Sequence, residues 1–155
     1  MDEKSFTDAV NQHRDLLYRV SYTVLHNSED CADALQDALM KAWQRLNTLR
    51  DDTRFRSWMT CIVVNCSRDI LRKRKVRLTE LTEDIPAPQV ENAHLDDTLQ
   101  RLDNRLRLPL TLHYMEGLSV QEIADALRLP QGTVKNRMHR GRQKLAELLG
   151  EEELV

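Results

Sequence analysis

Two helix starts separated by a helix break constrain the fold of this chain more than any other feature, and they lie within residues 119–149. Ser119 followed by Glu122 is the sequence of a capping box, in which each side chain satisfies a backbone N–H group at the start of a helix. Pro130 ends that helix, and Thr133 is placed to cap a second one that runs to the end of the stretch. The spacing predicts a helix-turn-helix.

The second predicted helix is rich in cations. Val134 and Met138 supply its apolar contacts, and a helix that enters a DNA major groove needs cations for phosphates and amide or guanidinium groups for base edges. A solvated surface helix is the alternative, but such helices usually mix both signs, and no acidic residue precedes Glu147 here. We therefore expect DNA contacts from its polar positions, which are Thr133, Lys135, Asn136, Arg137, His139, Arg140, Arg142 and Lys144.

The formal net charge of −2 conceals a segregation of charge along the chain. Basic residues gather at 68–77 and 135–144, whereas acidic residues gather at 80–97 and at the C-terminal end. A separate basic patch attracts a polyanion whatever the sum of the charges. The acidic balance therefore does not exclude nucleic acid as a partner.

Composition and motif content argue against several other classes of protein. No apolar run is long enough to span a bilayer and the N-terminus lacks a signal-peptide core, so we expect a cytoplasmic protein without membrane insertion. Cys31, Cys61 and Cys66 show no tight pairing pattern and are expected to be buried, reduced thiols. The scattered histidines predict no metal site, and we expect no cofactor. The sequence contains no nucleophile motif and no phosphate-binding loop, so nothing in it indicates an enzyme.

Helical periodicity covers most of the chain, without sustained strand alternation. Pro109 is expected to start or kink a helix, and Gly117 to end one. The fold class is therefore predicted to be all-α, with two small helical domains at 1–77 and 95–150 joined by a flexible acidic linker over 78–94. Within the first domain we predict helices over 6–25, 29–46 and 54–75, and a polar connection over 47–53.

The second predicted helix, 29–46, has two distinct faces. Ser28 is its expected cap, and its buried face is expected to carry Ala32, Leu35, Leu39, Ala42 and Leu46. The other side groups Asp33, Gln36, Asp37 and Met40 at i, i+3, i+4 and i+7. Most helices have a polar face, so this pattern alone is weak support for a binding surface.

The arrangement of the whole chain is more specific. It contains Leu17-Tyr18-Arg19, then Asn27 to Asp37, Lys41-Ala42-Trp43, Phe55-Arg56-Ser57-Trp58, Asn65, and Asp69 to Arg74. In order and spacing these residues resemble region 2 of the extracytoplasmic-function sigma factors of bacterial RNA polymerase. Residues 108–145 are similar to region 4 of the same family. Two matching regions at the right separation are a far stronger signal than a helix-turn-helix alone.

The resemblance implies roles for region 2. The face with Asp33, Gln36, Asp37 and Met40 matches the surface that docks on a coiled coil of the largest polymerase subunit. The loop and the following helix match the segments that capture the opening minus-10 promoter element. A base can stack on Trp58, although its place in an apolar stripe favours the core, as for Trp43. The minus-10 candidates are Asn47, Thr48, Asp51, Asp52, Arg54, Arg56, Trp58, Arg68, Arg72 and Lys73.

For region 4, the resemblance implies readout of the minus-35 element by Lys135, Asn136, His139 and Arg140. Arg140 suits guanine and Asn136 suits adenine, whereas Arg137, Arg142 and Lys144 suit phosphates. Family members often have serine where this chain has Asn136 and alanine where it has Gly141. Gly141 is therefore a departure that costs up to about 1 kcal/mol of helix stability relative to alanine.

The family role is that of a non-enzymatic factor that binds core RNA polymerase and promoter DNA and directs transcription initiation. The acidic linker is a candidate mimic of nucleic acid near the RNA exit path. Many family members also have an anti-sigma partner, and the sequence leaves open whether one exists here. A free-standing helix-turn-helix regulator explains residues 118–145 equally well but leaves the 33–40 face unexplained. An inactive sigma-like protein also remains an alternative.

Overall fold

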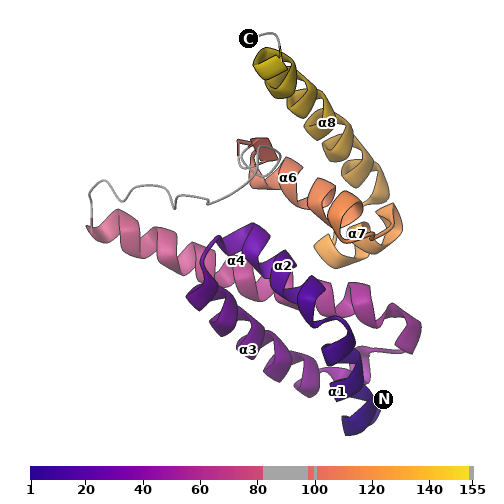
Figure 1. The fold of residues 1–155 in the computed structure, drawn as a ribbon. Helices are drawn as coiled ribbons and strands as arrows, with labels where there is room; N and C mark the ends of the chain where they lie inside the picture. The colour runs from indigo at the N-terminus through magenta and orange to yellow at the C-terminus, as the bar shows by residue number, and fades with distance from the viewer. Residues whose placement is uncertain (82–97, 100, 154–155) are drawn as a thin grey trace.

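A computed structural model of the protein describes residues 1–81, 98, 99 and 101–153. Every regular element within those residues is helical (Figure 1), as predicted for an all-α fold. The longer helices are α1 (Glu3–Gln12), α2 (Arg14–Leu25), α3 (Ser28–Gln44), α4 (Phe55–Leu81), α6 (Asn104–Leu110), α7 (Val120–Leu127) and α8 (Gln131–Glu153). Three short ones are η1 (Leu46–Thr48), η2 (Asp52–Arg54) and η3 (Thr111–Met115).

The N-terminal domain is built around α4, against which α2 and α3 pack. Phe55, Met59, Ile62 and Cys66 recur at helical spacing on α4 and are buried. Phe6 of α1 lies edge-on against Phe55, with ring centroids 6.1 Å apart. These contacts place the beginning of the chain over the beginning of α4.

The prediction of one helix over 6–25 is wrong, because the chain leaves helical geometry at His13. Its backbone has φ −105° and ψ 9°, and its ring nitrogen Nδ1 lies 2.8 Å from the carbonyl oxygen of Ala9. The His13 ring also lies 5.6 Å from the Phe55 ring. The break separates α1 from α2 and lets Phe6 and Leu17 bury against the same core from differently directed helices.

The buried face of α3 differs from the predicted one. Ala32 and Leu39 are exposed, and the fully buried positions are the smaller Cys31, Ala34, Ala38 and Ala42. Small side chains allow helix backbones to approach closely, whereas the leucines lie at the margins of the contact. The cap is also one residue earlier than predicted, because the side chain of Asn27 accepts a hydrogen bond from the Asp30 N–H at 2.9 Å.

The third predicted helix ends six residues later than expected, since α4 continues to Leu81. The first four residues of the predicted 78–94 linker therefore belong to α4, and its remainder lies outside the described residues. At the other end, the polar connection contains η1 and η2, and Arg54 lies in η2 rather than in α4. Both short helices hold the loop against the start of α4.

In the C-terminal domain, α6 includes the buried Pro109 and passes into η3, where hydrogen bonds span five residues. The Glu116 N–H donates to the carbonyl oxygen of Thr111 at 3.3 Å. Gly117 has φ +73°, a conformation that glycine adopts without steric cost, and it ends the helical segment as predicted. Pro109 therefore lies inside α6 and starts no new helix, contrary to one of the two expectations for it, and the helix type changes two residues later.

The helix-turn-helix is confirmed. The hydroxyl of Ser119 accepts from the Glu122 N–H, and a carboxylate oxygen of Glu122 accepts from the Ser119 N–H, both at 3.1 Å. The predicted cap of the second helix is wrong. α8 starts at Gln131, so Thr133 lies in its first turn, and the carbonyl oxygen of Pro130 accepts from the Val134 N–H at 3.2 Å. Proline fits this position because the start of a helix leaves N–H groups without partners.

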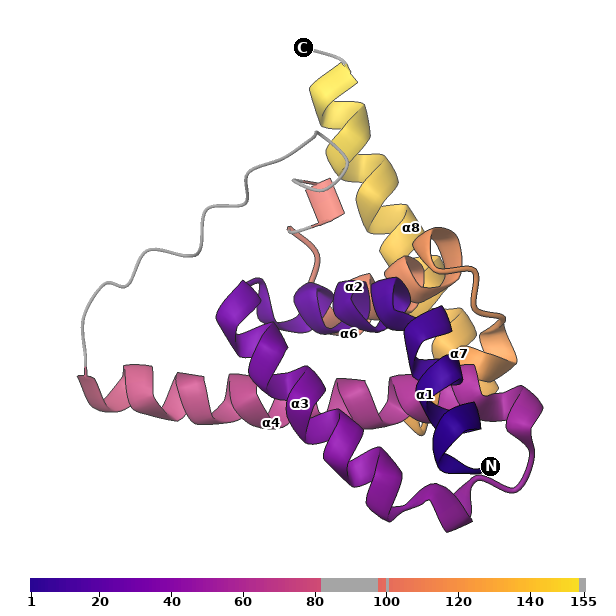
Figure 2. The same cartoon turned by 60° about the horizontal axis from the view of Figure 1, so that its bottom comes forward.

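The two helical domains share one buried apolar cluster, which runs from Phe6 to Met138. α4 lies between the N-terminal helices on one side and α7 on the other (Figures 1 and 2), and α6 packs on α8 and also contacts α2. The prediction of two helical domains is confirmed, and the structure adds that they are in contact.

Candidate functional site

The first candidate surface is the outer face of α3. Asp33, Gln36, Asp37 and Met40 are all exposed, and Met40 keeps 58% of its surface accessible. The three polar side chains also border a shallow groove with Lys73 of α4. The alanines on the opposite side of α3 anchor the helix, so this face projects outward on a rigid element.

Trp43 continues the same exposed region and contradicts the prediction that it belongs to the core. It keeps 47% of its surface accessible, although its ring lies 5.4 Å from that of Phe6. The helix places it one turn beyond Met40 and away from the buried alanines. An exposed tryptophan beside an exposed methionine adds an apolar element to the polar face of α3.

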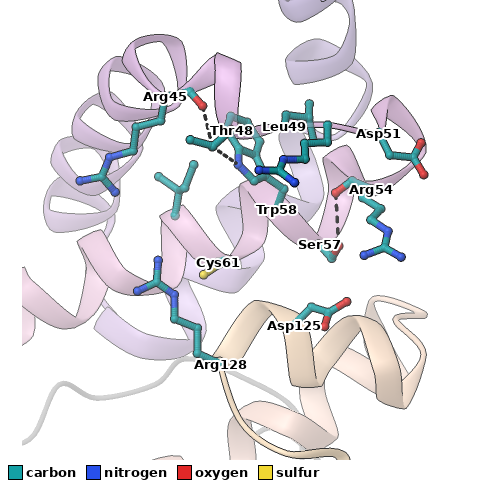
Figure 3. A pocket seen from close by; sticks show the side chains of 12 residues that line it. Arg45, Thr48, Leu49, Asp51, Arg54, Ser57, Trp58, Cys61, Asp125 and Arg128 are labelled. Carbon is teal, nitrogen blue, oxygen red and sulfur yellow. Dashed lines mark hydrogen bonds between the residues drawn. The ribbon is translucent and has the colours of Figure 1, made fainter.

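The second candidate surface is a hollow of about 750 Å³ beside the 46–54 loop. The indole N–H of Trp58 donates to the hydroxyl of Thr48 at 3.1 Å, and this bond ties the loop to α4 (Figure 3). Its lining combines guanidinium groups with apolar side chains, a combination that suits an unpaired base and its phosphates. The lining residues include Arg45, Thr48, Leu49, Arg50, Asp51, Arg54, Trp58, Cys61 and Arg128.

Only some of the minus-10 candidates in and beside the loop line the hollow. Thr48, Asp51, Arg54 and Trp58 line the hollow, whereas Asn47 and Asp52 are exposed and are not part of its lining. The Asp51 carboxylate accepts from both the hydroxyl and the N–H of Thr53, and these bonds lower the pKa of Asp51. Asp51 therefore acts first as a cap that shapes the loop.

Trp58 fits neither sequence interpretation completely. It is half-buried, its ring lies 5.9 Å from that of Phe55, and one side of it borders the hollow. The ring is therefore held by the core at one edge and presented to the hollow at another. Such a held aromatic ring loses little conformational freedom when a base stacks on it.

The cations of α4 fall into two groups. Arg72 and Lys73 are exposed. Arg56 instead forms an ion pair with Glu122 of α7, with its Nη2 atom 2.8 Å from Oε1. Arg68 is exposed, but partial desolvation and then the charge of Arg137 lower its pKa, so the second domain also influences this side chain.

The third candidate surface is α8. Lys135, Asn136, His139 and Arg140 are exposed on it, as base readout requires. Val134 and Met138 are buried and fix the rotation of the helix, which confirms their predicted apolar contacts. The phosphate candidates Arg142 and Lys144 are also exposed, and Arg142 donates to the hydroxyl of Tyr114 at 3.2 Å. Thr133 and Arg137 are half-buried.

Sequence reasoning did not single out Arg45, Arg50 or Arg128 as lining residues of the hollow. Arg128 follows α7 with φ +57°, in the left-handed region that non-glycine residues seldom adopt. Arg45 lies two residues before the predicted 47–53 loop and Arg50 lies within it, so their positions were a signal that was available in the sequence. Arg128 comes from the other domain, more than 70 residues away from either of them, and no sequence pattern relates them.

Comparison with protein families divides the chain into two segments, one in each helical domain. Residues 9–77 match sigma-70 region 2, and residues 93–145 match sigma-70 region 4. The chain is 36% identical to the ECF RNA polymerase sigma factor SigM of Mycobacterium tuberculosis, over 96% of this chain and 79% of that protein. The chain belongs to the extracytoplasmic-function group of the sigma-70 family. Its role as a sigma factor is to bind core RNA polymerase and promoter DNA in transcription initiation.

Other relatives extend the comparison. The ECF sigma factor SigW of Bacillus subtilis is 28% identical, over 96% of this sigma factor and 90% of SigW. The structure of CnrH in complex with the cytosolic domain of CnrY matches with a TM-score of 0.73 at 27% identity, over 97% of this chain and 90% of that one. RpoE in complex with the anti-sigma factor NepR from Bartonella quintana shares the fold, with a TM-score of 0.77 at 24% identity, over 95% and 98% of the two chains.

Within the part of the chain that the structure describes, no helix combines the length and apolarity that crossing a bilayer requires.

Proposed function

We propose that this sigma factor anchors on core RNA polymerase through the exposed face of α3. The observation that carries the proposal is the position of Asp33, Gln36 and Asp37 on the outer side of a helix whose inner side is fixed by buried alanines. Carboxylates and an amide suit a basic, hydrogen-bonding partner surface. Met40 adds an exposed apolar contact to the same face.

In this proposal the domain at 1–77 also engages the minus-10 element. The hollow beside the 46–54 loop receives an unpaired base, with Trp58 as the stacking surface and Arg54 near its phosphate. Arg72 and Lys73 hold phosphates of the opened strand. Asn47 and Asp52 contribute through the loop rim, and Arg56 and Arg68 through the face of α4 that α7 contacts.

The domain at 95–150 reads the minus-35 element as duplex DNA. Asn136 and Arg140 are the base readers that α8 exposes, with Lys135 and His139 beside them. The protein acts entirely by binding, in the cytoplasm, and supplies no catalytic group. CnrH and RpoE were solved as complexes with CnrY and with the anti-sigma factor NepR, which supports an anti-sigma protein as a further partner.

The first test is co-elution of the purified protein with bacterial core RNA polymerase. Asp33→Arg combined with Gln36→Ala replaces an acceptor by a cation and removes an amide on the proposed face. We expect stoichiometric co-elution of the wild-type protein and none of the double variant, because truncating charged contacts at an interface costs about 2–5 kcal/mol. Asp8→Arg combined with Gln12→Ala is the matched control, because both residues are exposed on α1.

If the double variant still co-elutes with the polymerase, the surface that anchors the protein lies elsewhere than on α3. Failure of the wild-type protein to co-elute, together with tight binding of duplex DNA by the protein alone, favours a free-standing helix-turn-helix regulator instead. Loss of binding in both the α3 and the α1 variants indicates a folding defect, which far-UV circular dichroism of the same samples reveals.

A further inference from the structure

The hollow beside the 46–54 loop is lined from both domains. Arg45, Leu49 and Trp58 come from region 2, whereas Asp125 of α7 and Arg128, which follows α7, come from region 4 (Figure 3). Its volume of about 750 Å³ falls within the range of small-molecule sites, which is about 300–1,000 Å³. The hollow therefore has the size of a site for one small molecule.

Four guanidinium groups line this hollow without a carboxylate of their own. Within the residues that the structure describes, none of the four takes part in an ion pair, and all four are exposed. They are Arg45, Arg50, Arg54 and Arg128. A guanidinium group binds phosphate oxygens through two parallel hydrogen bonds, so a cluster of them suits a ligand that carries several phosphates.

An apolar wall lies among these cations. Leu49, Ile62 and the Trp58 ring all line the hollow. The ring is held in place, because it packs on Phe55 and its N–H donates to the hydroxyl of Thr48 at 3.1 Å. An inorganic polyanion gains nothing from such a wall, whereas a flat heterocyclic base stacks on a fixed aromatic ring. The lining therefore favours a nucleotide over phosphate alone.

The carboxylate of Asp125 gives the two ends of the hollow opposite character. Asp125 is exposed and forms no ion pair within the described residues, and Figure 3 shows it beneath Ser57, whereas Arg128 lies beside Cys61. A carboxylate repels phosphate but accepts hydrogen bonds from neighbouring N–H groups. Guanine offers two such donors side by side, N1–H and its 2-amino group, whereas adenine places an acceptor beside its amino group. The Asp125 end therefore suits guanine.

We propose that the hollow binds a free guanine nucleotide with two or more phosphates, in a site to which both domains contribute. The base stacks on Trp58 and donates from N1–H and its 2-amino group to Asp125. The phosphates bind the guanidinium groups of Arg45, Arg50 and Arg128. Because the nucleotide contacts both domains, its binding free energy also stabilises the contact between them.

The nucleotide and the minus-10 base compete for the same stacking surface. This consequence rests on the proposed minus-10 role of the hollow, whereas binding of the nucleotide itself does not. Both ligands place a base on Trp58, so only one of them occupies the hollow at a time. A rise in the concentration of guanine nucleotide therefore weakens binding of the opened promoter strand.

Trp58 provides a built-in probe of binding. The chain has two tryptophans, so Trp43→Phe makes Trp58 the only one, and phenylalanine keeps an aromatic ring against Phe6. In this full-length background we expect GTP to quench the fluorescence of Trp58 saturably. ATP should need at least about tenfold higher concentration, because it leaves the Asp125 carboxylate with a mismatched partner. Inorganic pyrophosphate should leave the fluorescence unchanged and displace GTP only weakly.

Two substitutions in region 4 test the two ends of the site in the same background. Asp125→Asn should weaken GTP binding about tenfold and leave ATP binding almost unchanged, since it removes the acceptor that selects guanine. Arg128→Gln should weaken both nucleotides about tenfold, since it removes a phosphate contact. Asp8→Asn and Arg105→Gln are the matched controls, because each removes one charge from an exposed side chain outside the hollow.

Four results would overturn the inference. If no nucleotide quenches Trp58, the hollow is not a nucleotide site. If pyrophosphate displaces GTP as well as GTP itself does, the cations bind any polyanion and the apolar wall has no role. Equal affinities for GTP and ATP exclude selection of guanine by Asp125. Equal affinities of the Arg128→Gln and Arg105→Gln variants for GTP show that region 4 supplies no phosphate contact.

Failure of this inference is distinguishable from failure of the proposed function. Arg72 and Lys73 are exposed and do not line the hollow, so their replacement by alanine tests the minus-10 role of α4 without changing the nucleotide site. If these substitutions leave strand opening by the polymerase holoenzyme unchanged, the minus-10 role is wrong even where GTP binds. If they impair opening but GTP does not bind, the inference fails and the minus-10 role stands.

Discussion

Gly141 of α8 lies against Leu110 of α6 so closely that a Cβ atom on the glycine would be 2.6 Å from Cδ1 of Leu110. The same Cβ would be 3.4 Å from the backbone oxygen of Leu106. The resemblance to the sigma factors implies alanine at this position, and the close approach of the two helices explains the departure. Glycine is retained inside a helix here because the neighbouring leucine, which is 2% exposed, occupies the space.

Gly141→Ala is therefore expected to destabilise the protein. Alanine gains about 1 kcal/mol of helix propensity, but overpacking of a buried contact costs about 1–3 kcal/mol, so we expect a net loss of about 1 kcal/mol. Gly132→Ala is the matched control in the same helix, with no atom within 4 Å of the added Cβ, and it should stabilise. Urea denaturation of both variants measures the difference, and equal shifts would contradict this explanation.

His26 predicts a pH dependence of stability. It ends α2 with φ 54°, and burial, then the charges of Arg107 and Arg74, lowers its pKa to about 4 from 6.5. The unfolded chain takes up this proton as the pH falls below 6.5, whereas the folded protein resists it until about pH 4, so stability is lost across that interval. His26→Asn tolerates the left-handed backbone and should flatten the dependence of the unfolding free energy on pH.

Removal of the capping box is expected to destabilise the helix-turn-helix. Ser119→Ala removes the acceptor for the Glu122 N–H and should cost about 1 kcal/mol of unfolding free energy. Ser119→Asp keeps a capping oxygen and should cost much less. Chemical denaturation compares the two variants. If alanine and aspartate have the same effect, the cap contributes nothing measurable to the domain.

Two cations of α8 are expected to contribute differently to DNA binding, one to base recognition and the other to overall affinity. Arg140→Ala should cost about 1–3 kcal/mol and relax the preference at one base pair of the minus-35 element. Lys144→Ala should weaken binding of all duplexes similarly and reduce the dependence of affinity on salt. Fluorescence anisotropy with a panel of duplexes at several salt concentrations separates the two. Equal losses on every duplex for both variants would assign Arg140 to phosphate.

Local patterns explain why much of the fold could be predicted. The capping box spans four residues, and Gly117 requires only its own backbone conformation, so both were visible in the sequence. The buried face of α3 was predicted wrongly because hydrophobicity ranks leucine above alanine. Packing of α3 on α2 and α4 instead selects the small side chains of Cys31 and Ala34, whose advantage depends on the neighbouring helices.

The sequence by itself determined an all-α chain with a helix-turn-helix, a cationic second helix and an exposed acidic face on α3, because each follows from residues within a few turns of one another. Only the tertiary structure decided that α7 covers α4 and that Arg56 pairs with Glu122, 66 residues away. A contact between two such distant residues depends on how whole helices pack together, and no local preference of either residue encodes that packing.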